Sequence, residues 1–247
     1  MKKLQFILVA ILVSSLTQHT WAKSDAHASD SHANKNNQAK ESHGHERHKG
    51  PVSAEEAFKK LANGNKRYLT GKLRLDGHGH QERKKLVEGQ SPYAIVLSCS
   101  DSRVPPELVF DQGLGEIFVI RSAGQALDSS TIASIEYAVS HLGSNLIVVM
   151  GHESCGAVKA ALGTLNGGDA GSIWLNNLVK DLHPRLKKFS GLKQSDGVKV
   201  ESWSNVNGVA FDLMDRSEII SNAVKSGDVE IKKALYHLGS GNVEWHD

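Results

Sequence analysis

Two short apolar runs, each followed at once by potential metal ligands, constrain the fold of this chain more than any other feature. The runs are residues 93–98 (YAIVLS) and residues 145–150 (NLIVVM). Short, near-continuous runs rich in β-branched residues are typical of parallel strands covered on both faces. Cys99 follows the first run and His152 the second. Since open α/β sheets bind ligands at the carboxyl ends of their strands, we expect these two residues to lie close together.

The cysteine count turns this edge of the sheet into a candidate metal centre. Cys99 and Cys155 are the two cysteines of the chain, and His152 lies three residues before the second. Two thiolates and an imidazole are ligands suited to zinc, and three protein ligands leave a fourth position for water or substrate. A structural disulfide between Cys99 and Cys155 is the alternative, because residues 1–22 predict export, as described below, and two cysteines of an exported protein usually form a disulfide.

A carboxylate and a guanidinium follow the first cysteine directly. Arg103 lies two residues after Asp101, and its planar fork can hold that carboxylate bidentately. Held in this way, Asp101 would stay ionised, would be kept off the metal, and would orient a metal-bound water. Asp101 itself could become the fourth metal ligand only in a closed form that blocks the reaction position. The alternative is an ordinary surface ion pair, which contributes about 0–1 kcal/mol.

The rest of the chain alternates predicted strands with predicted helices. This alternation indicates an α/β fold with a mostly parallel central sheet flanked by helices. Further strands are predicted at residues 116–120, 229–238 and 243–245. Helices are predicted after Ser53, which with Glu56 forms a capping box, and at residues 105–109, 128–142, 156–165, 173–186 and 206–224. Residues 190–202 are predicted to be a surface loop.

The N-terminal 50 residues have a different composition from the rest of the chain. Residues 1–22 carry Lys2-Lys3, an apolar stretch and a small-residue cleavage site, and are predicted to be a bacterial secretory signal peptide. Residues 23–50 are polar, with a composition typical of a disordered linker. This linker is His-rich: it contains His27, His32, His43, His45 and His48. It is either a solvated tether or a weak metal-binding tract. We expect a secreted, periplasmic protein whose catalytic domain spans residues 51–247.

Composition and motif checks exclude several other classes of protein. The net charge is only +2, and the basic residues are spread along the chain rather than clustered, so no basic patch for nucleic-acid binding is predicted. No membrane association is expected after signal cleavage. His152-Glu153 does not continue as a zincin helix, because position 156 is glycine. No C-x-x-C motif occurs. Thiol catalysis by Cys155 with His152 stays open at this stage.

The two motifs together resemble those of the β-class carbonic anhydrases. Cys99-x-Asp101-x-Arg103 and His152-x-x-Cys155 stand in the family's order, about fifty residues apart, and the resemblance runs from about Ser53 to Trp245. It implies that Cys99, His152 and Cys155 bind one Zn²⁺ per subunit and that Asp101 and Arg103 form the catalytic dyad. It also implies a homodimer, or a multiple of one, in which an N-terminal helical arm packs on the neighbouring subunit.

The resemblance assigns further residues to the substrate pocket. Gln90 matches a glutamine that contacts substrate across the dimer interface in the plant-like, open-site subtype. Phe118, Ala123 and Tyr137 match positions that line the pocket, and His141 matches a proposed proton relay. Val96 stands where the other subtype carries a tryptophan, which favours the open-site subtype. Ser122-Ala-Gly124 departs from the family, where many members have an asparagine after the strand arginine.

From the residues themselves, the backbone N–H of Gly156 is a candidate donor at the start of a helix.

The function implied is the reversible hydration of CO2 to bicarbonate and a proton by zinc-bound hydroxide. Two alternatives stay open. One is hydrolysis of a CO2-like sulfur compound, such as carbonyl sulfide, at the same zinc. The other is a non-enzymatic exported zinc-binding protein that uses the His-rich linker. The expected small-molecule partners of the enzyme are CO2 and bicarbonate.

Overall fold

Five strands form the central sheet of the computed structural model, which describes residues 50–246. The predicted signal peptide and all of the His-rich linker before Gly50 lie outside the described residues. The strands follow the order β2-β1-β3-β4-β5. β1 pairs in parallel with both β2 and β3, β3 pairs in parallel with β4, and β5 closes the sheet antiparallel to β4. The bounds are β1 Ala94–Ser98, β2 Ile117–Arg121, β3 Leu146–His152, β4 Glu230–Tyr236 and β5 Val243–His246.

The chain reverses its winding direction between the two strands that carry the candidate ligands. From β1 it crosses to β2 on one side, and it then returns to place β3 on the other side of β1. Ser98 is in register with Met150, so both chain segments leave the sheet at the same edge. Such a switch point is where doubly wound sheets form their ligand sites. The predicted α/β class and the predicted strands are confirmed.

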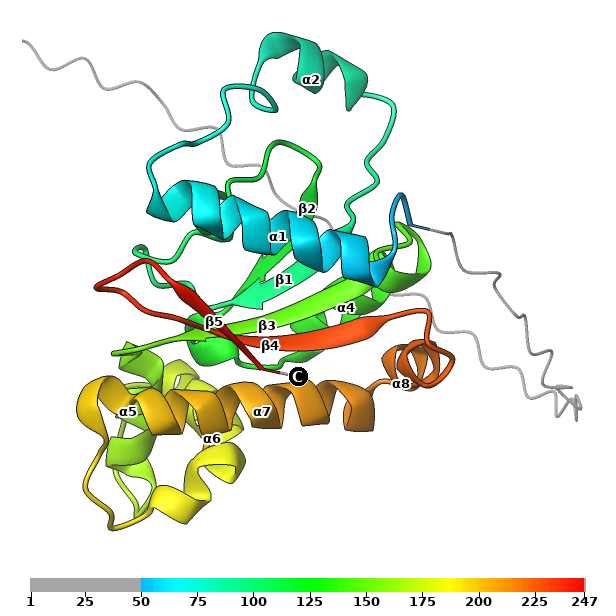
Figure 1. Ribbon diagram of the computed structural model, residues 1–247. Coiled ribbons are helices and arrows are strands. Elements are labelled where there is room, and N and C mark those ends of the chain that lie inside the picture. The colour runs from blue at the N-terminus through cyan, green and yellow to red at the C-terminus, as the bar shows by residue number, and fades with distance from the viewer. Residues whose placement is uncertain (1–49, 247) are drawn as a thin grey trace, which may run out of the picture. The chain divides into compact units, whose positions relative to one another are not determined.

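Helices cover both faces of this sheet (Figure 1). On one face, Ala57 and Leu61 of α1 pack with Val96, Val148 and other sheet residues. On the opposite face, α4, α7 and α8 pack against the other side of the same strands. The bounds are α1 Ala54–Leu69, α2 His80–Lys85, α3 Pro106–Val109, α4 Ser129–Ser140, α5 Gly156–Thr164, α6 Ile173–Leu186, α7 Lys199–Arg216 and α8 Glu218–Lys225. Within residues 50–246, no helix is both long enough and apolar enough to span a bilayer.

Helix ends follow from local sequence. The Ser53 hydroxyl accepts the N–H of Glu56 at 3.2 Å, as half of the predicted capping box, and Asp128 caps α4 through the N–H of Thr131. α1 buries its apolar side on the chain's own sheet. Packing of this helix on a neighbouring subunit therefore stays a prediction.

Two predictions for the C-terminal third were wrong. The single helix predicted over residues 206–224 is two helices, because the buried Ser217 ends α7 and its hydroxyl caps α8 through the N–H of Ile220. The loop predicted over residues 190–202 contains a 3₁₀ turn, Asp196–Val198, and α7 already begins at Lys199. Hydrophobic spacing did not reveal this helix start because a buried Glu201 and Ser202 occupy its first turn.

Candidate metal centre

The sheet edge brings the two cysteines and the histidine together. Cys99 directly follows β1, and His152 is the last residue of β3. A turn at Ser154 then places Cys155 at the N-cap of α5. One ligand atom from each of Cys99, His152 and Cys155 lies within 4.8 Å of the others, and all three side chains are buried. Among the residues that the structure describes, this is the one group with such an arrangement.

The two cysteines are free thiols in this arrangement. Their Sγ atoms are 4.0 Å apart, and no disulfide joins them. The disulfide alternative is therefore not what the structure shows. A separation of this size lets two sulfur atoms share one tetrahedral ion at Zn–S distances of about 2.3 Å.

The hydrogen bonding of His152 leaves one ring nitrogen free to bind a metal. Nδ1 lies 2.8 Å from the carbonyl oxygen of Glu153. A carbonyl only accepts, so Nδ1 carries the proton and Nε2 keeps its lone pair. Nε2 is fully buried and has no hydrogen-bond partner in the structure. Buried polar atoms are rarely left unpaired, so this nitrogen indicates a ligand, and an Nδ1–H donated to a carbonyl is the usual arrangement of metal-bound histidine.

The surroundings of the thiols favour the thiolate at Cys99. The pKa of Cys99 lies below its ordinary value because the Cys155 thiol donates a hydrogen bond to it, and the N–H of Gly124 adds to this effect. Donating that proton, together with burial, raises the pKa of Cys155. Because a metal ion binds thiolates, metal binding at this site would favour loss of the thiol protons.

Asp101 is held beside the ligand group as the sequence predicted. The Arg103 guanidinium donates two hydrogen bonds, Nε to Oδ1 at 2.9 Å and Nη2 to Oδ2 at 2.7 Å, and the N–H of Arg103 adds a third at 3.0 Å. These bonds hold the pKa of the Asp101 carboxyl well below its usual range. Asp101 Oδ2 lies 3.8 Å from His152 Nε2, so an ionised carboxylate faces the place where the metal would bind.

Arg121 at the end of β2 supports the loop that carries Asp101. It donates from Nε to the carbonyl of Cys99 at 3.0 Å and from Nη2 to the carbonyl of Asp101 at 2.6 Å. This arginine was assigned no role from the sequence, although its place directly after the predicted strand at residues 116–120 was a usable signal. The two arginines together fix both the side chain and the backbone of Asp101.

Gly124 and Asn205 also belong to this site, although neither was assigned a role from the sequence. A Cβ at Gly124, where φ is +65°, would lie 2.9 Å from the Cβ of Ala157 and 2.7 Å from Leu182, so only glycine brings this N–H up to Cys99. Asn205 of α7 donates to the Gly124 carbonyl at 2.7 Å. Because 81 residues separate the two, no local pattern could have paired them.

The residues predicted for the substrate pocket divide into two groups. Ala123 precedes Gly124 beside Cys99, and Gly156 begins α5 after Cys155. The N–H groups that lower the pKa of the Cys155 thiol belong to Val158 and Ala157, two residues and one residue after the predicted Gly156 donor.

The second group does not lie at this edge of the sheet in the single chain. Gln90 precedes β1 and is exposed, so the length of the strand, roughly 17 Å, separates it from Cys99. Phe118 is in register with Ile95 near the start of β1. The ring centroid of Phe118 lies 6.5 Å from that of Tyr137. The ring centroid of Tyr137 lies 5.2 Å from that of His141. Tyr137 is half exposed, contrary to the core position that aromatic residues usually occupy.

Comparisons with known proteins agree on one family. A family model described as carbonic anhydrase matches residues 94–243. A carbonic anhydrase of Mycolicibacterium smegmatis is 40% identical over 190 residues, which cover 76% of this chain and 91% of that protein. Carbonic anhydrase 2 of Mycobacterium tuberculosis is 38% identical over 193 residues, with coverages of 77% and 92%.

Solved structures give the same match in three dimensions. The β-carbonic anhydrase CcaA aligns with a TM-score of 0.61 at 27% identity, covering 77% of this chain and 95% of that one. One of two tetrameric β-carbonic anhydrases from Sordaria macrospora aligns with a TM-score of 0.59 at 25% identity, with coverages of 77% and 96%.

Proposed function

This chain belongs to the β class of the carbonic anhydrase family, and we propose that it hydrates CO2 reversibly to bicarbonate and a proton with one Zn²⁺ per subunit. The observation that carries the proposal is the buried group of Cys99, His152 and Cys155 with the Arg103-held carboxylate of Asp101 beside it. Three soft-to-borderline ligands with a fourth position facing a carboxylate suit a catalytic zinc site rather than a structural one.

Zinc fits the residues that are present. His152 offers an unpaired, buried Nε2, and Cys99 has a lowered pKa. Bound there, the ion would lower the pKa of a water in its fourth position toward neutrality, which makes a nucleophile for CO2. We propose the open form of the site, because the two carboxylate oxygens of Asp101 are taken up by Arg103.

The chain's own residues would do the rest of the work. Asp101 would stay ionised and would accept a hydrogen bond from the water that attacks CO2, which would orient that water toward the substrate carbon. Arg103 and Arg121 keep the carboxylate and its backbone in place. Ala126 and Val158 pack in one apolar cluster with the two cysteines. Apolar surroundings of this kind suit an uncharged substrate such as CO2.

We also propose a homodimer or a multiple of one, in which Gln90, Phe118, Tyr137 and His141 act at the neighbour's site. The positions of Gln90 and Phe118, away from Cys99 in the single chain, support this reading. The related β-carbonic anhydrases of Sordaria macrospora are tetrameric.

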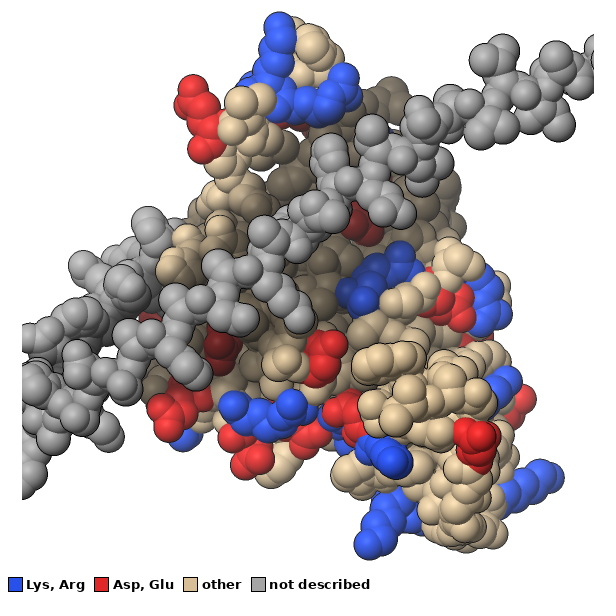
Figure 2. Space-filling model, turned by 180° about the vertical axis from the view of Figure 1, so that it is seen from behind, with Lys and Arg blue, Asp and Glu red and all other residues tan. Residues whose placement is uncertain are grey.

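Figure 2 shows acidic and basic side chains interspersed over one face, with basic residues gathered over α2, where Arg83, Lys84 and Lys85 lie. Absence of a nucleic-acid partner stays a prediction.

Stopped-flow CO2 hydration, measured together with elemental zinc analysis, tests the proposed function. The expected result is one zinc per chain and rapid hydration that strong chelation abolishes. A clear preference for carbonyl sulfide over CO2 would replace the substrate. Several loosely held zinc ions without hydration would favour the zinc-binding protein.

Export to the periplasm is proposed from residues 1–22 alone. Cell fractionation of the full chain, compared with a chain that begins at Lys23, tests it: only the full chain should reach the periplasm. A second comparison, with a chain that begins at Gly50, separates the linker from catalysis. The enzyme proposal predicts unchanged turnover after this truncation, whereas loss of function would favour the zinc-binding alternative.

A further inference from the structure

One peptide group beside the metal centre is fixed at both of its ends. This group joins Glu153 to Ser154. Its carbonyl oxygen accepts the Nδ1–H of His152 at 2.8 Å, and its N–H, on Ser154, donates to the carbonyl of Gly197 at 2.6 Å. Rotating this peptide would therefore break the hydrogen bond that selects the tautomer and the ring orientation of His152. The Gly197 carbonyl thus acts on the histidine through a single peptide plane.

The backbone on both sides of this contact is held in an unfavourable conformation. Ser154 has φ +57°, and Val198 has φ +47° although it is β-branched. Residues of this kind are disfavoured in the left-handed region, and they persist there where the surrounding structure enforces the conformation. The Val198 side chain is fully buried in the cluster that contains Cys99 and Cys155. The turn at Asp196–Val198 is therefore packed against the metal centre as well as hydrogen-bonded to it.

A buried carboxylate holds this turn. Glu201 is 2% exposed and lies in the first turn of α7. Its Oε1 accepts the N–H of Ser195 at 2.8 Å, and its Oε2 accepts the Ser195 hydroxyl, which itself accepts the N–H of Val200 at 3.1 Å. Lys199 adds a link to Glu153 at 3.2 Å, but this pair is partly exposed and contributes little. Glu201 is thus the buried group that closes the turn.

We propose that Glu201 is a positioning residue for the metal centre: by holding Ser195 it places the Gly197 carbonyl, which fixes the Glu153–Ser154 peptide and through it the imidazole of His152. The inference rests on the proposed zinc site. It gives residues 195–201, within the predicted surface loop, an indirect part in metal retention. Groups that orient metal-bound histidines typically change metal affinity by about 10–100-fold when they are removed.

The test measures zinc release from the holoprotein to a chromogenic chelator. Glu201→Ala is expected to release zinc about tenfold faster than wild type or more, whereas Glu201→Gln, which keeps an acceptor for the Ser195 N–H, stays within about threefold. Asp111→Ala is the matched control, because Asp111 is also a buried carboxylate that accepts a backbone N–H and a side-chain donor, and these come from Arg74 and Arg67 rather than from the turn beside the metal centre. Melting temperatures of the metal-free proteins measure the loss of stability separately.

The outcomes separate positioning from general destabilisation. Faster release from Glu201→Ala, with Asp111→Ala releasing zinc as wild type does despite a lowered melting temperature, supports the inference. Equal release from both variants overturns it. If Glu201→Ala does not fold, Ser195→Ala replaces it, and faster release again supports the inference while wild-type release overturns it. A wild-type protein that holds no zinc would overturn the proposed function and this inference together.

Discussion

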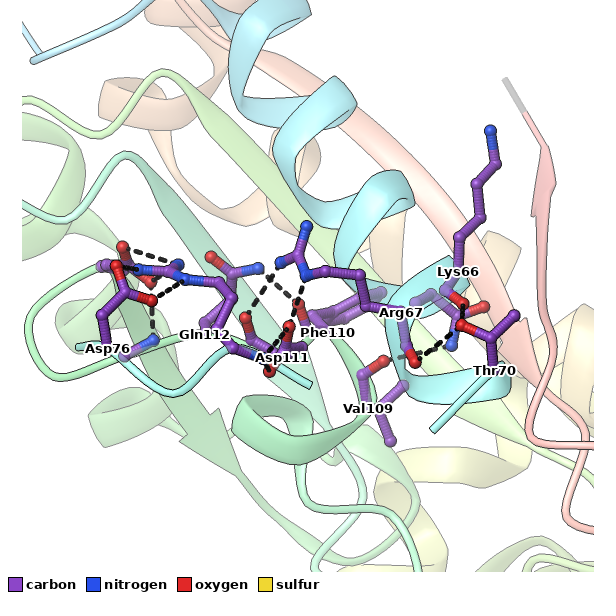
Figure 3. A network of polar contacts seen from close by, with 12 residues as sticks. Lys66, Arg67, Thr70, Asp76, Val109, Phe110, Asp111 and Gln112 are labelled. Atoms are coloured by element: carbon purple, nitrogen blue, oxygen red, sulfur yellow. Dashed lines mark hydrogen bonds and ion pairs between the residues drawn. The ribbon is translucent and has the colours of Figure 1, made fainter. Parts of the chain in front are cut away.

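Two aspartate–arginine pairs of similar chemistry occupy contrasting places in this protein. Asp101 and Arg103 are two residues apart, and their guanidinium is 54% exposed. Asp111 and Arg67 are 44 residues apart, with an Nε–Oδ2 distance of 2.5 Å and a carboxylate that is 4% exposed. The first pair follows β1 beside the metal centre. The second joins the end of α1 to the residues after α3 (Figure 3).

The difference teaches how to assign a role to an ion pair. Asp111 also accepts the N–H of Arg74, so the end of α1, the segment that follows it and the residues after α3 meet on one buried carboxylate, and its role is structural. Asp101 ties only its own loop, but it faces His152 at 3.8 Å. An exposed pair between near neighbours adds little to stability. The value of the Asp101 pair must therefore lie in the carboxylate that it presents, and the following variants should separate the two pairs.

The largest effect is expected from removing a metal ligand. Cys155→Ser should lower turnover by more than about 10³-fold, since without the metal neither pair can supply a nucleophile. Hydration assays and zinc content of the purified variant check this. If the wild type kept its activity under strong chelation, thiol catalysis by Cys155 and His152 would replace the zinc mechanism.

Asp101→Asn should lower kcat by about 10²-fold or more, because the amide cannot serve as the ionised acceptor that orients the attacking water. Zinc content should be unchanged, and the free energy of unfolding should fall by roughly 1 kcal/mol near neutral pH, because the amide loses the charge-assisted hydrogen bonds from Arg103. Steady-state kinetics and denaturant unfolding measure the two quantities. Full activity in this variant would place Asp101 with the structural pairs.

The pH dependence of the Asp101 pair follows from the lowered pKa of its carboxyl. A lowered carboxyl pKa contributes stability that is present above the unfolded-state pKa of about 4 and is lost as the pH falls through the folded-state value. The difference in melting temperature between wild type and Asp101→Asn should thus be constant from about pH 5 to 8 and shrink only below about pH 4. Shrinkage already near pH 6 would contradict the lowered pKa.

Arg103→Lys should have a smaller effect, a loss in kcat of roughly tenfold, because an ammonium keeps the charge but cannot hold both carboxylate oxygens in one plane. The KM for CO2 should stay near the wild-type value, since Arg103 is not placed against the substrate. Unchanged kcat would show that charge alone, rather than the bidentate geometry, keeps Asp101 in place.

Asp111→Asn should leave turnover unchanged while lowering the free energy of unfolding by about 1.5–3 kcal/mol, the usual cost of losing a hydrogen bond to a charged group. Asparagine tolerates the left-handed backbone at this position, where φ is +48°, so the change removes the charge without adding strain. Thermal unfolding with parallel kinetics checks both statements. Loss of turnover at unchanged stability would remove the contrast between the two pairs.

The strand ends were predictable from local sequence, and so were the residues that they carry. Residues 93–98 and 145–150 are near-continuous apolar runs, which predicts central parallel strands, and the pairing of β1 with β3 then brings Cys99 and His152 to one edge. The capping residues Ser53 and Asp128 were visible for the same reason, since each acts within one helical turn. When the two partners of an interaction lie within four residues of each other, a local sequence motif is enough to predict their contact.

The parts that were missed depend on partners far along the chain. Asn205 reaches Gly124 across 81 residues, and the Gly197 carbonyl reaches Ser154 from a segment with loop-like composition. Polarity at residues 190–202 indicated solvent, yet Glu201 and Ser202 are buried because the turn before α7 returns to the metal centre. Periodicity reports which face of an element is apolar, and it contains no information on which distant backbone group a buried polar side chain will contact.

Sequence by itself determined the α/β class, the identity of the three candidate ligands and the Asp101–Arg103 pair, because strand burial and short-range spacing are local properties. Only the tertiary structure decided that the thiols stay free 4.0 Å apart, that His152 presents an unpaired Nε2, and that Arg121, Gly124 and the turn at Asp196–Val198 surround them. The physical reason is that these features are distances between segments, which the packing of helices on both faces of one sheet sets.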